Sequence, residues 1–366
     1  MKKKLLCILH RSPPFHGAAK VGDFIGESKK LGEEFDCRFI TIKSSDTIGD
    51  IGKVNVKKFY LVAELFVKVM VALVVFRPHK IYFTASISSV AFYRDLLVSI
   101  LWKFYALFRS VDVYYHYHTK GIDSFVSSSA RNLKLTNFFV KNVTMVLLSP
   151  LLEKDLEKVN TYKNVVFLPN GVEDSYDEQS FRKYIENKSF EAINVLYLSN
   201  MIKEKGYFEV LKLASSCKDK NYHFHFAGGW KSADDEKEFF DFVRENELES
   251  TVTFHGFVNG AQKKELFEKS QILIFPTRYK LESFGLVIIE AFSYGVPVLS
   301  TDEGSIPFII DEKSGVVIDD VEKLSAAFSE ALTRFINAGT AKYCRKRYLE
   351  NFSLEQFEEN LVGVFR

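Results

Sequence analysis

The sequence predicts an α/β protein of two domains, and three observations support this prediction. At 366 residues the chain is longer than one ordinary hydrophobic core requires. Short apolar runs bounded by turn residues alternate with helix-length segments in both halves, which gives two βαβ-like halves. The hydrophobic content of 47 % with 26 % charged residues is typical of a folded chain and excludes disorder.

Charge is divided unevenly between the two halves. Residues 1–172 carry 25 Lys and Arg against 14 Asp and Glu, a net charge of +11. Residues 173–366 carry 24 against 33, a net charge of −9. A positive first half suits an acidic acceptor or an anionic membrane surface, and clustering of solvated lysines is the alternative.

The cysteines and the first residues indicate the compartment. Four scattered cysteines form no pair at metal or redox spacing, which favours a reducing cytoplasm. Residues 1–4 resemble the charged start of a signal peptide. The apolar run at 5–9 that follows is too short for export and predicts a first strand.

The first half contains two apolar segments between predicted strands. We expect strands at 5–9, 81–86, 111–117, 143–150 and 164–173. The segment 59–76 has 16 apolar residues of 18, interrupted by Glu64 and Lys68. Each charge at the centre of a membrane-spanning helix costs about 2.5 to 3.5 kcal/mol, so a span is disfavoured. We interpret this helix, and a second at 91–108, as packed in the core, with a membrane interface as the alternative.

The second half repeats the pattern of strands and helices. A polar linker is predicted at 173–191. A strand, a loop and a helix follow from residue 193. Further strands are expected at 223–230, 251–258 and 271–277. A Ser-x-x-Gln capping box at Ser353 and Gln356 predicts a final helix.

The stretch ESFGLVIIE, residues 282–290, carries the strongest functional signal. Ser283 is suited to cap a helix from Phe284 to about Tyr294 whose middle is apolar on every side, so the helix is predicted to be buried. A carboxylate there, Glu290, needs a hydrogen-bond donor from the protein or a ligand, and we favour a ligand. Free amides at the helix start suit an anion, and Gly285 allows a phosphate to come close.

Embedded in residues 276–310, this stretch resembles the Glu-x7-Glu motif of family-four retaining glycosyltransferases. These enzymes have the GT-B fold, in which two Rossmann-like domains face a cleft. The resemblance implies that Glu282 lies by the donor sugar and that Glu290 holds the ribose hydroxyls. It also implies that the backbone of Ser283, Phe284 and Gly285 binds the diphosphate.

The resemblance extends over nearly the whole chain and implies its domain organisation. Residues 1–172 would form the acceptor-side domain, and residues 192–352 the domain that binds the nucleotide sugar. The C-terminal helix at 353–366 would cross back to the first domain.

Further residues acquire roles through the resemblance. In the first half, Gly17 lies in a loop that approaches the donor phosphate, with Ala18 replacing a usual second glycine. His118 follows a strand and would face the donor sugar, and His116, two residues earlier, is a weaker candidate. Asn170 and Gly171 match a turn near the cleft.

In the second half, Lys205 with Gly206 fits the phosphate-binding Lys-Gly of the family. Asn200 stands where the family usually has an arginine, so Lys203 or Arg278 would supply a second cation, if one is present. Phe257 and Val258 would contact the nucleobase.

The expected reaction is transfer of a sugar from a nucleotide-diphosphate sugar, UDP favoured over GDP, with retention. The acceptor would be a glycan or a polyprenyl-diphosphate-linked, surface-polysaccharide precursor. The sequence contains no Asp-x-Asp, so we expect no metal and no cofactor. We expect no nucleic-acid partner and a cytoplasmic location, and contact with the inner face of the cell membrane is left open. The alternatives are a catalytically silent nucleotide-sugar-binding subunit and, less favoured, a nucleotide-sugar epimerase.

Overall fold

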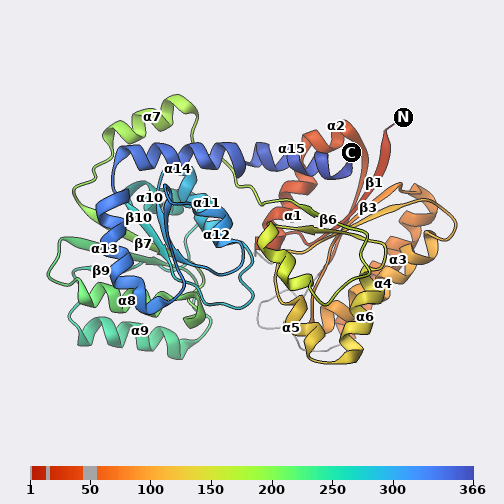
Figure 1. Cartoon of the computed structure of the whole chain (residues 1–366), viewed down its shortest axis with the longest axis horizontal. Coiled ribbons are helices and arrows are strands. Elements are labelled where there is room, and N and C mark those ends of the chain that lie inside the picture. Colours follow the sequence, from red (N-terminus) through yellow and green to blue (C-terminus); the bar gives the residue numbers. More distant parts are fainter. Residues whose placement is uncertain (1, 14–16, 44–55) are drawn as a thin grey trace. The chain divides into compact units, whose positions relative to one another are not determined.

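The computed structural model describes residues 2–13, 17–43 and 56–366 (Figure 1). Its contacts divide the chain into two units, one of Met1–Gly171 with Leu354–Arg366 and the other of Val172–Ser353. Each unit contains a parallel sheet of six strands with helices packed around it. The predicted α/β class is confirmed.

The first unit is built on a sheet with the strand order β2-β1-β3-β4-β5-β6. Its strands are β1 (Lys3–Leu9), β2 (Phe35–Thr41), β3 (Lys80–Thr84), β4 (Asp112–His116), β5 (Thr144–Leu147) and β6 (Asn164–Phe167). Its helical segments are α1 (Gly17–Glu27), α2 (Lys29–Glu34), α3 (Val56–Val71), the π-helical η2 (Ala72–Phe76), α4 (Ser89–Tyr105), α5 (Ile122–Ser127), α6 (Ala130–Val140), η3 (Pro150–Leu156) and α15 (Leu354–Phe365).

Neighbouring residues of β3 point to opposite faces of this sheet, as the pleat of a strand requires. The ring of Tyr82 lies 5.5 Å from that of Phe365 in α15, within a core that includes α1 and α2. The ring of Phe83 lies 5.2 Å from that of Trp102 in α4. Helices α1, α2 and α15 therefore cover one face, and α3, α4 and α6 cover the other (Figure 1).

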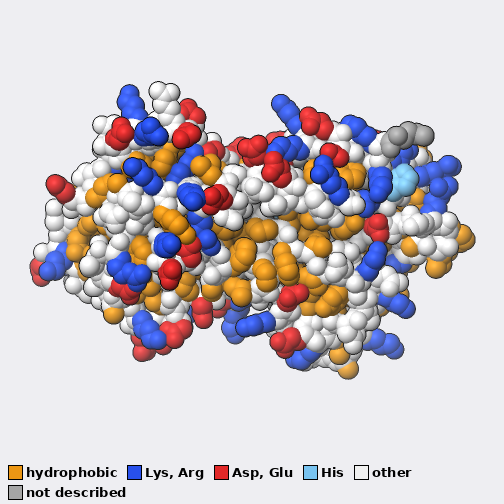
Figure 2. Space-filling model, turned by 45° about the horizontal axis from the view of Figure 1, so that its top comes forward, with side chains coloured by type: hydrophobic (Ala, Val, Ile, Leu, Met, Phe, Trp, Pro, Cys, Tyr) orange, Lys and Arg blue, Asp and Glu red, His pale blue; other side chains and the backbone are white. Residues whose placement is uncertain are grey.

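The second unit has the strand order β12-β11-β10-β7-β8-β9. Its strands are β7 (Ile193–Leu198), β8 (Tyr222–Ala227), β9 (Val252–Phe254), β10 (Ile272–Phe275), β11 (Val298–Thr301) and β12 (Gly315–Ile318). Its helical segments are α7 (Glu178–Asn187), η4 (Lys203–Lys205), α8 (Tyr207–Ser216), α9 (Ala233–Glu245), α10 (Gly260–Lys269), α11 (Leu286–Ser293), α12 (Ile306–Ile309), η5 (Val321–Lys323), α13 (Leu324–Phe335) and α14 (Ala338–Asn351). Acidic and basic side chains are interspersed over this unit in Figure 2.

The strands predicted near residues 5–9, 81–86, 111–117 and 271–277 are confirmed, as is the C-terminal helix. The polar stretch that we interpreted as a linker contains helix α7. This helix is ordered by a small apolar cluster in which Phe181 and Ile185 pack against Ala341 of α14. Two buried residues on a mostly polar helix are too weak a pattern to identify it from the sequence.

The interpretation of residues 59–76 and 91–108 as core helices is wrong for their outer faces. Both segments are helical, and inner residues such as Val69 and Trp102 are buried. The helix Phe59–Phe76 has a mean hydropathy of 2.3, yet only 22 % of it is buried. By length and composition alone it could cross a membrane.

Candidate active site in the second unit

The lysine turn after β7 is held against the end of β10. Lys205 ends η4 and is followed by Gly206, whose backbone has a φ of +86°. A Cβ atom at Gly206 would lie 2.4 Å from the carbonyl oxygen of Pro276. Only glycine combines this φ with so close an approach, so the turn fixes Lys205 beside the loop that follows β10.

Lys205 and Glu282 form an ion pair in this position. The Lys205 Nζ lies 3.1 Å from a carboxylate oxygen of Glu282, and the two side chains are 18 % and 12 % exposed. The ammonium group also lies 5.8 Å from the ring of Phe275 and 5.4 Å from that of Tyr279. The pair is thus shielded on one side, which strengthens its interaction with any further charge that enters.

Helix α11 begins later than predicted, and the predicted Ser283 cap is wrong. The helix starts at Leu286, and its N-cap is Gly285, with a φ of +79° and no side-chain cap hydrogen bond. The first-turn hydrogen bond runs from Ile288 N to Gly285 O at 2.9 Å. The left-handed backbone at Gly285, which glycine adopts without steric cost, sets the helix start. The helix amides that precede Ile288 have no acceptor within the helix.

Glu290 has a protein partner that the sequence did not suggest. Its carboxylate lies 2.5 Å from the Nζ of Lys263 in α10, and its side chain is 13 % exposed. The sequence favours a ligand as the group that compensates the buried carboxylate, and the structure corrects this expectation by supplying Lys263. Lys263 stands 27 positions away on a helix without a distinguishing motif, so its role depends on the packing of α10 against α11.

The cations considered as a second phosphate ligand are both engaged with carboxylates. Lys203 Nζ lies 2.5 Å from Glu238 and 3.7 Å from Asp235 of α9. Arg278 pairs with Glu209 of α8 at 3.1 Å. Lys205 is therefore the candidate lysine that the structure brings to Glu282.

The remaining candidates of this unit lie on loops at the ends of strands. Asn200 is exposed two residues after β7. Phe257 and Val258 follow β9, and Phe257 is 67 % exposed. An exposed aromatic ring suits stacking on a flat partner, and the nucleobase role remains a prediction.

The two histidines of the first unit differ in environment. His116 ends β4, is fully buried and is hydrogen-bonded through Nδ1 to the hydroxyl of Tyr82. Burial, and then the nearby His118, lower the pKa of His116 well below its ordinary value. The ring of His118 lies 4.0 Å from that of His116, and although the residue is partly exposed, both of its ring nitrogens are buried. His116 is thus a structural residue, and the catalytic role of His118 remains a prediction.

The loop after His118 is fixed by one carboxylate. Asp155 accepts hydrogen bonds from the amides of Gly121, Ile122 and Asp123 at 2.7 to 2.9 Å. Three amide donors to one carboxylate hold this loop rigidly. The other candidate of this unit, Gly17, is the exposed first residue of α1, and the preceding residues 14–16 lie outside the described part of the chain.

Within the described ranges, no three His, Cys, Asp or Glu side chains are grouped closely enough to hold a metal ion.

Comparison with known proteins finds a family match within the second unit. Residues 179–348 match the family described as Glycosyl transferases group 1. An uncharacterized 41.2 kDa protein in the cps region of Klebsiella pneumoniae is 26 % identical over 179 residues, 48 % of this chain and 47 % of that protein. O-antigen chain mannosyltransferase C of Escherichia coli is 32 % identical over 121 residues, 32 % of this chain and 33 % of that protein. The chain thus matches less than half the length of these curated relatives.

The likeness to solved structures extends over the whole chain. The crystal structure of Anabaena HepE in complex with UDP-glucose matches with a TM-score of 0.67 over 99 % of both chains, at 15 % identity. At that identity the likeness concerns the fold.

Proposed function

We propose that this chain is a glycosyltransferase of the GT-B fold that transfers a sugar from a nucleoside-diphosphate donor to a hydroxyl of a surface-polysaccharide precursor. The family match of residues 179–348 and the likeness of fold support the proposal. The observation that carries this proposal is the ion pair of Lys205 with Glu282, four residues before helix α11. The pair provides one cation and one carboxylate close in sequence to the start of α11, within the region that matches the family.

Each group has a proposed role in the transfer. As the bond to the sugar breaks, negative charge builds on the leaving diphosphate. Lys205, together with the backbone amides that precede Val287 at the start of α11, would stabilise this charge. Glu282 would accept hydrogen bonds from the sugar, and Glu290 from the ribose. We keep His118 and Gly17 as candidate site residues on the family resemblance alone.

The finer features are proposals as well. Retention follows the family resemblance, with the leaving diphosphate helping to activate the acceptor hydroxyl. No metal is assigned, because one lysine and the helix amides offer an alternative to a divalent cation. UDP is the favoured nucleotide, supported by the likeness to a fold that binds UDP-glucose. The acceptor class is supported by relatives named for a cps region and for the O-antigen chain.

A donor panel tests the proposal first. UDP- and GDP-sugars are each added to the protein with and without EDTA, and the unfolding temperature is measured. A ligand that binds the folded state raises the unfolding temperature in proportion to the logarithm of its concentration over Kd. We expect a UDP-sugar to give the largest rise, unchanged by EDTA.

Release of nucleoside diphosphate tests the residues. We expect Lys205→Ala to lower the rate about 10²- to 10³-fold, the effect of removing one group that stabilises a developing anion. Lys212→Ala, which removes an exposed lysine of α8, is the control and should leave the rate unchanged. Equal rates in wild type, Lys205→Ala and Glu282→Ala would instead favour a silent sugar-binding subunit. Isomerised donor in the absence of acceptor would favour an epimerase.

A further inference from the structure

Helix α4 of the first unit is apolar on the side that faces solvent. Its exposed large residues recur every three or four positions and lie between 43 % and 63 % exposed; they are Val90, Tyr93, Leu97, Ile100 and Phe104. This spacing places them on one face of the helix. The opposite face buries Phe92, Val98 and Trp102. A surface helix normally turns polar residues outward, so this face lacks a partner in the described structure.

The neighbouring helix repeats the feature. The exposed large residues of α3 and η2 are Phe59, Tyr60, Val67, Met70, Val71, Val74 and Val75. Helices α3 and α4 pack against each other (Figure 1). With Leu107 and Phe108 after α4, the two helices hold 14 of the 21 exposed large apolar side chains among the described residues. We call these 14 side chains the helix-pair surface. Such a concentration marks an interaction site.

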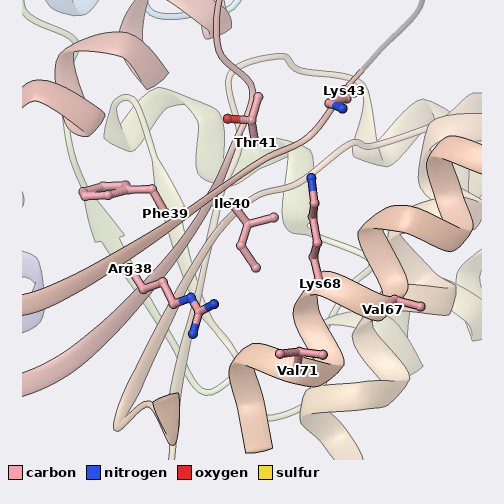
Figure 3. A pocket seen from close by; sticks show the side chains of 8 residues that line it. All are labelled: Arg38, Phe39, Ile40, Thr41, Lys43, Val67, Lys68 and Val71. Atoms are coloured by element: carbon pink, nitrogen blue, oxygen red, sulfur yellow. The ribbon is translucent and has the colours of Figure 1, made fainter. Parts of the chain in front are cut away.

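A cationic pocket adjoins the helix-pair surface. It has a volume of about 480 Å³ and lies between β2 and α3 (Figure 3). Arg38, Lys43 and Lys68 line it, together with Val67 and Val71 of the surface. In Figure 3 Lys68 extends toward Lys43, and Arg38 projects from β2.

The pocket keeps an excess of positive charge. Glu64 lies 3.0 Å from the Nζ of Lys43 and 2.6 Å from that of Lys68, and it offsets one of the three cations. A pocket that combines cations with an apolar margin suits an anionic amphiphile.

From these contacts we propose that the helix-pair surface lies in the headgroup region of an anionic phospholipid bilayer, with a lipid phosphate in the pocket of Arg38, Lys43 and Lys68. The inference rests on the proposed function, because an acceptor linked to a lipid is met at a membrane. Apolar side chains would enter the acyl boundary while the cations stay at the phosphates.

The charges disfavour a second copy of the chain as the occupant. Residues 59–110 contain six Lys and Arg against two Asp and Glu. Lys80 is buried, and the two acids, Glu64 and Asp95, already pair with Lys68 and Arg94, so that Arg77, Lys103 and Arg109 have no acidic partner among the described ion pairs. In a symmetric dimer the same patch meets itself, so its cations would face cations without acidic partners.

The burial pattern disfavours a membrane-spanning helix. The inner side of α3 and η2 packs in the unit, where Leu65, Val69 and Ala72 are at most 5 % exposed. The helix would therefore lie along the membrane surface with one side embedded.

Vesicle flotation of the full chain tests the inference. Vesicles contain phosphatidylcholine alone or mixed with an equal amount of phosphatidylglycerol. We expect binding to the anionic vesicles, weakened by salt and abolished by alkaline washing. Leu97→Glu and Phe104→Glu, at exposed positions, should each reduce binding about tenfold or more. Lys43→Glu should reduce binding to anionic vesicles about fivefold or more. Leu349→Glu in α14, a residue of similar exposure to Leu97, should bind as wild type.

The outcomes separate this inference from the proposed function. Urea unfolding of each variant checks that it is folded, independently of donor binding. No flotation of the wild type with anionic vesicles, or undiminished flotation of Leu97→Glu, would overturn the inference whatever the transferase activity. A dimer in solution that Leu97→Glu dissociates, without vesicle binding, would identify a second copy as the occupant. Resistance to alkaline washing would indicate a spanning helix. Vesicle binding without diphosphate release would leave the inference standing and refute the transferase.

Discussion

The charges near helix α11 are paired before any ligand is present. Lys205 holds Glu282, and Lys263 holds Glu290, in contacts of 3.1 Å and 2.5 Å. Each carboxylate is thereby oriented in a mostly buried place, where an unpaired charge would be unfavourable by several kcal/mol. Hydroxyl groups of a ligand can then be recognised without reorganising the site.

A chain of neutral histidines makes the second unit sensitive to acid. His225 contacts His255 through Nδ1 and Asn194 through Nε2, both at 3.1 Å. Burial first, and then the charges of Lys269, His223 and His255, lower the pKa of His225 to about 3. The unfolded chain takes up this proton below about pH 6.5, whereas the folded chain does so only near pH 3. Stability from this group is therefore complete above pH 6.5 and lost as the pH falls toward 3.

We expect His225→Gln to flatten this dependence, because glutamine keeps a donor and an acceptor but does not titrate. Between pH 6 and 5 the wild type should lose about 1 kcal/mol more unfolding free energy than the variant, from a limiting slope of about 1.4 kcal/mol per pH unit. Urea unfolding at each pH, followed by the fluorescence of Trp230 in a Trp102→Phe background, measures the unfolding free energy of both proteins. Parallel pH dependences of the two proteins would contradict the assignment.

At the scale of elements, the short segment η4 positions the candidate lysine through its contact with the end of β10. Gly206 allows this contact, and the left-handed backbone there is unfavourable for any residue with a Cβ. The position of η4 therefore depends more on Gly206 than on the identity of the neighbouring residues.

Replacing this glycine tests the element. Gly206→Ala combines a φ of +86° with a Cβ 2.4 Å from a backbone oxygen, so we expect a loss of about 2 kcal/mol or more of unfolding free energy. Diphosphate release should fall as well, because Lys205 moves with the turn. Gly229→Ala is the matched control, since its Cβ would meet no atom within 4 Å. Equal stability of the two variants would show that the turn adapts.

At the scale of the whole molecule, the end of the chain completes the core of the first unit. The ring of Phe365 lies 5.9, 5.5 and 5.1 Å from those of Phe35, Tyr82 and Tyr114, in each case nearly perpendicular. The side chain is fully buried. A unit formed mostly by the first 171 residues therefore depends on a residue that lies far away in the sequence.

Phe365→Ala should reveal this dependence. We expect it to lower the unfolding free energy of the first unit by about 3 to 5 kcal/mol, the effect of truncating a buried aromatic ring. Fluorescence of Trp102 in a Trp230→Phe background reports this unit. Glu359→Ala, which removes an exposed ion pair of α15 with Lys30, should change the unfolding free energy of the first unit by no more than about 1 kcal/mol. An unchanged Trp102 transition in Phe365→Ala would place α15 outside the cooperative core.

The sequence by itself determined the α/β class, the places of several strands and the stretch around Glu282. These depend on local properties, namely apolar runs, turn residues and the spacing of neighbouring positions. The glycine cap of α11 is a local feature too, but it competes with Ser283, and the backbone geometry that decides between them is set by packing.

Only the tertiary structure decided which distant groups meet and which apolar faces remain exposed. Lys205 and Glu282 are 77 positions apart, and no pattern in the sequence connects Lys263 with Glu290. Residues 59–76 have the composition of a core or a membrane helix, and what covers each face depends on the rest of the fold. Hydropathy records how strongly a side chain avoids water, whereas burial depends on whether another part of the protein is there to cover it.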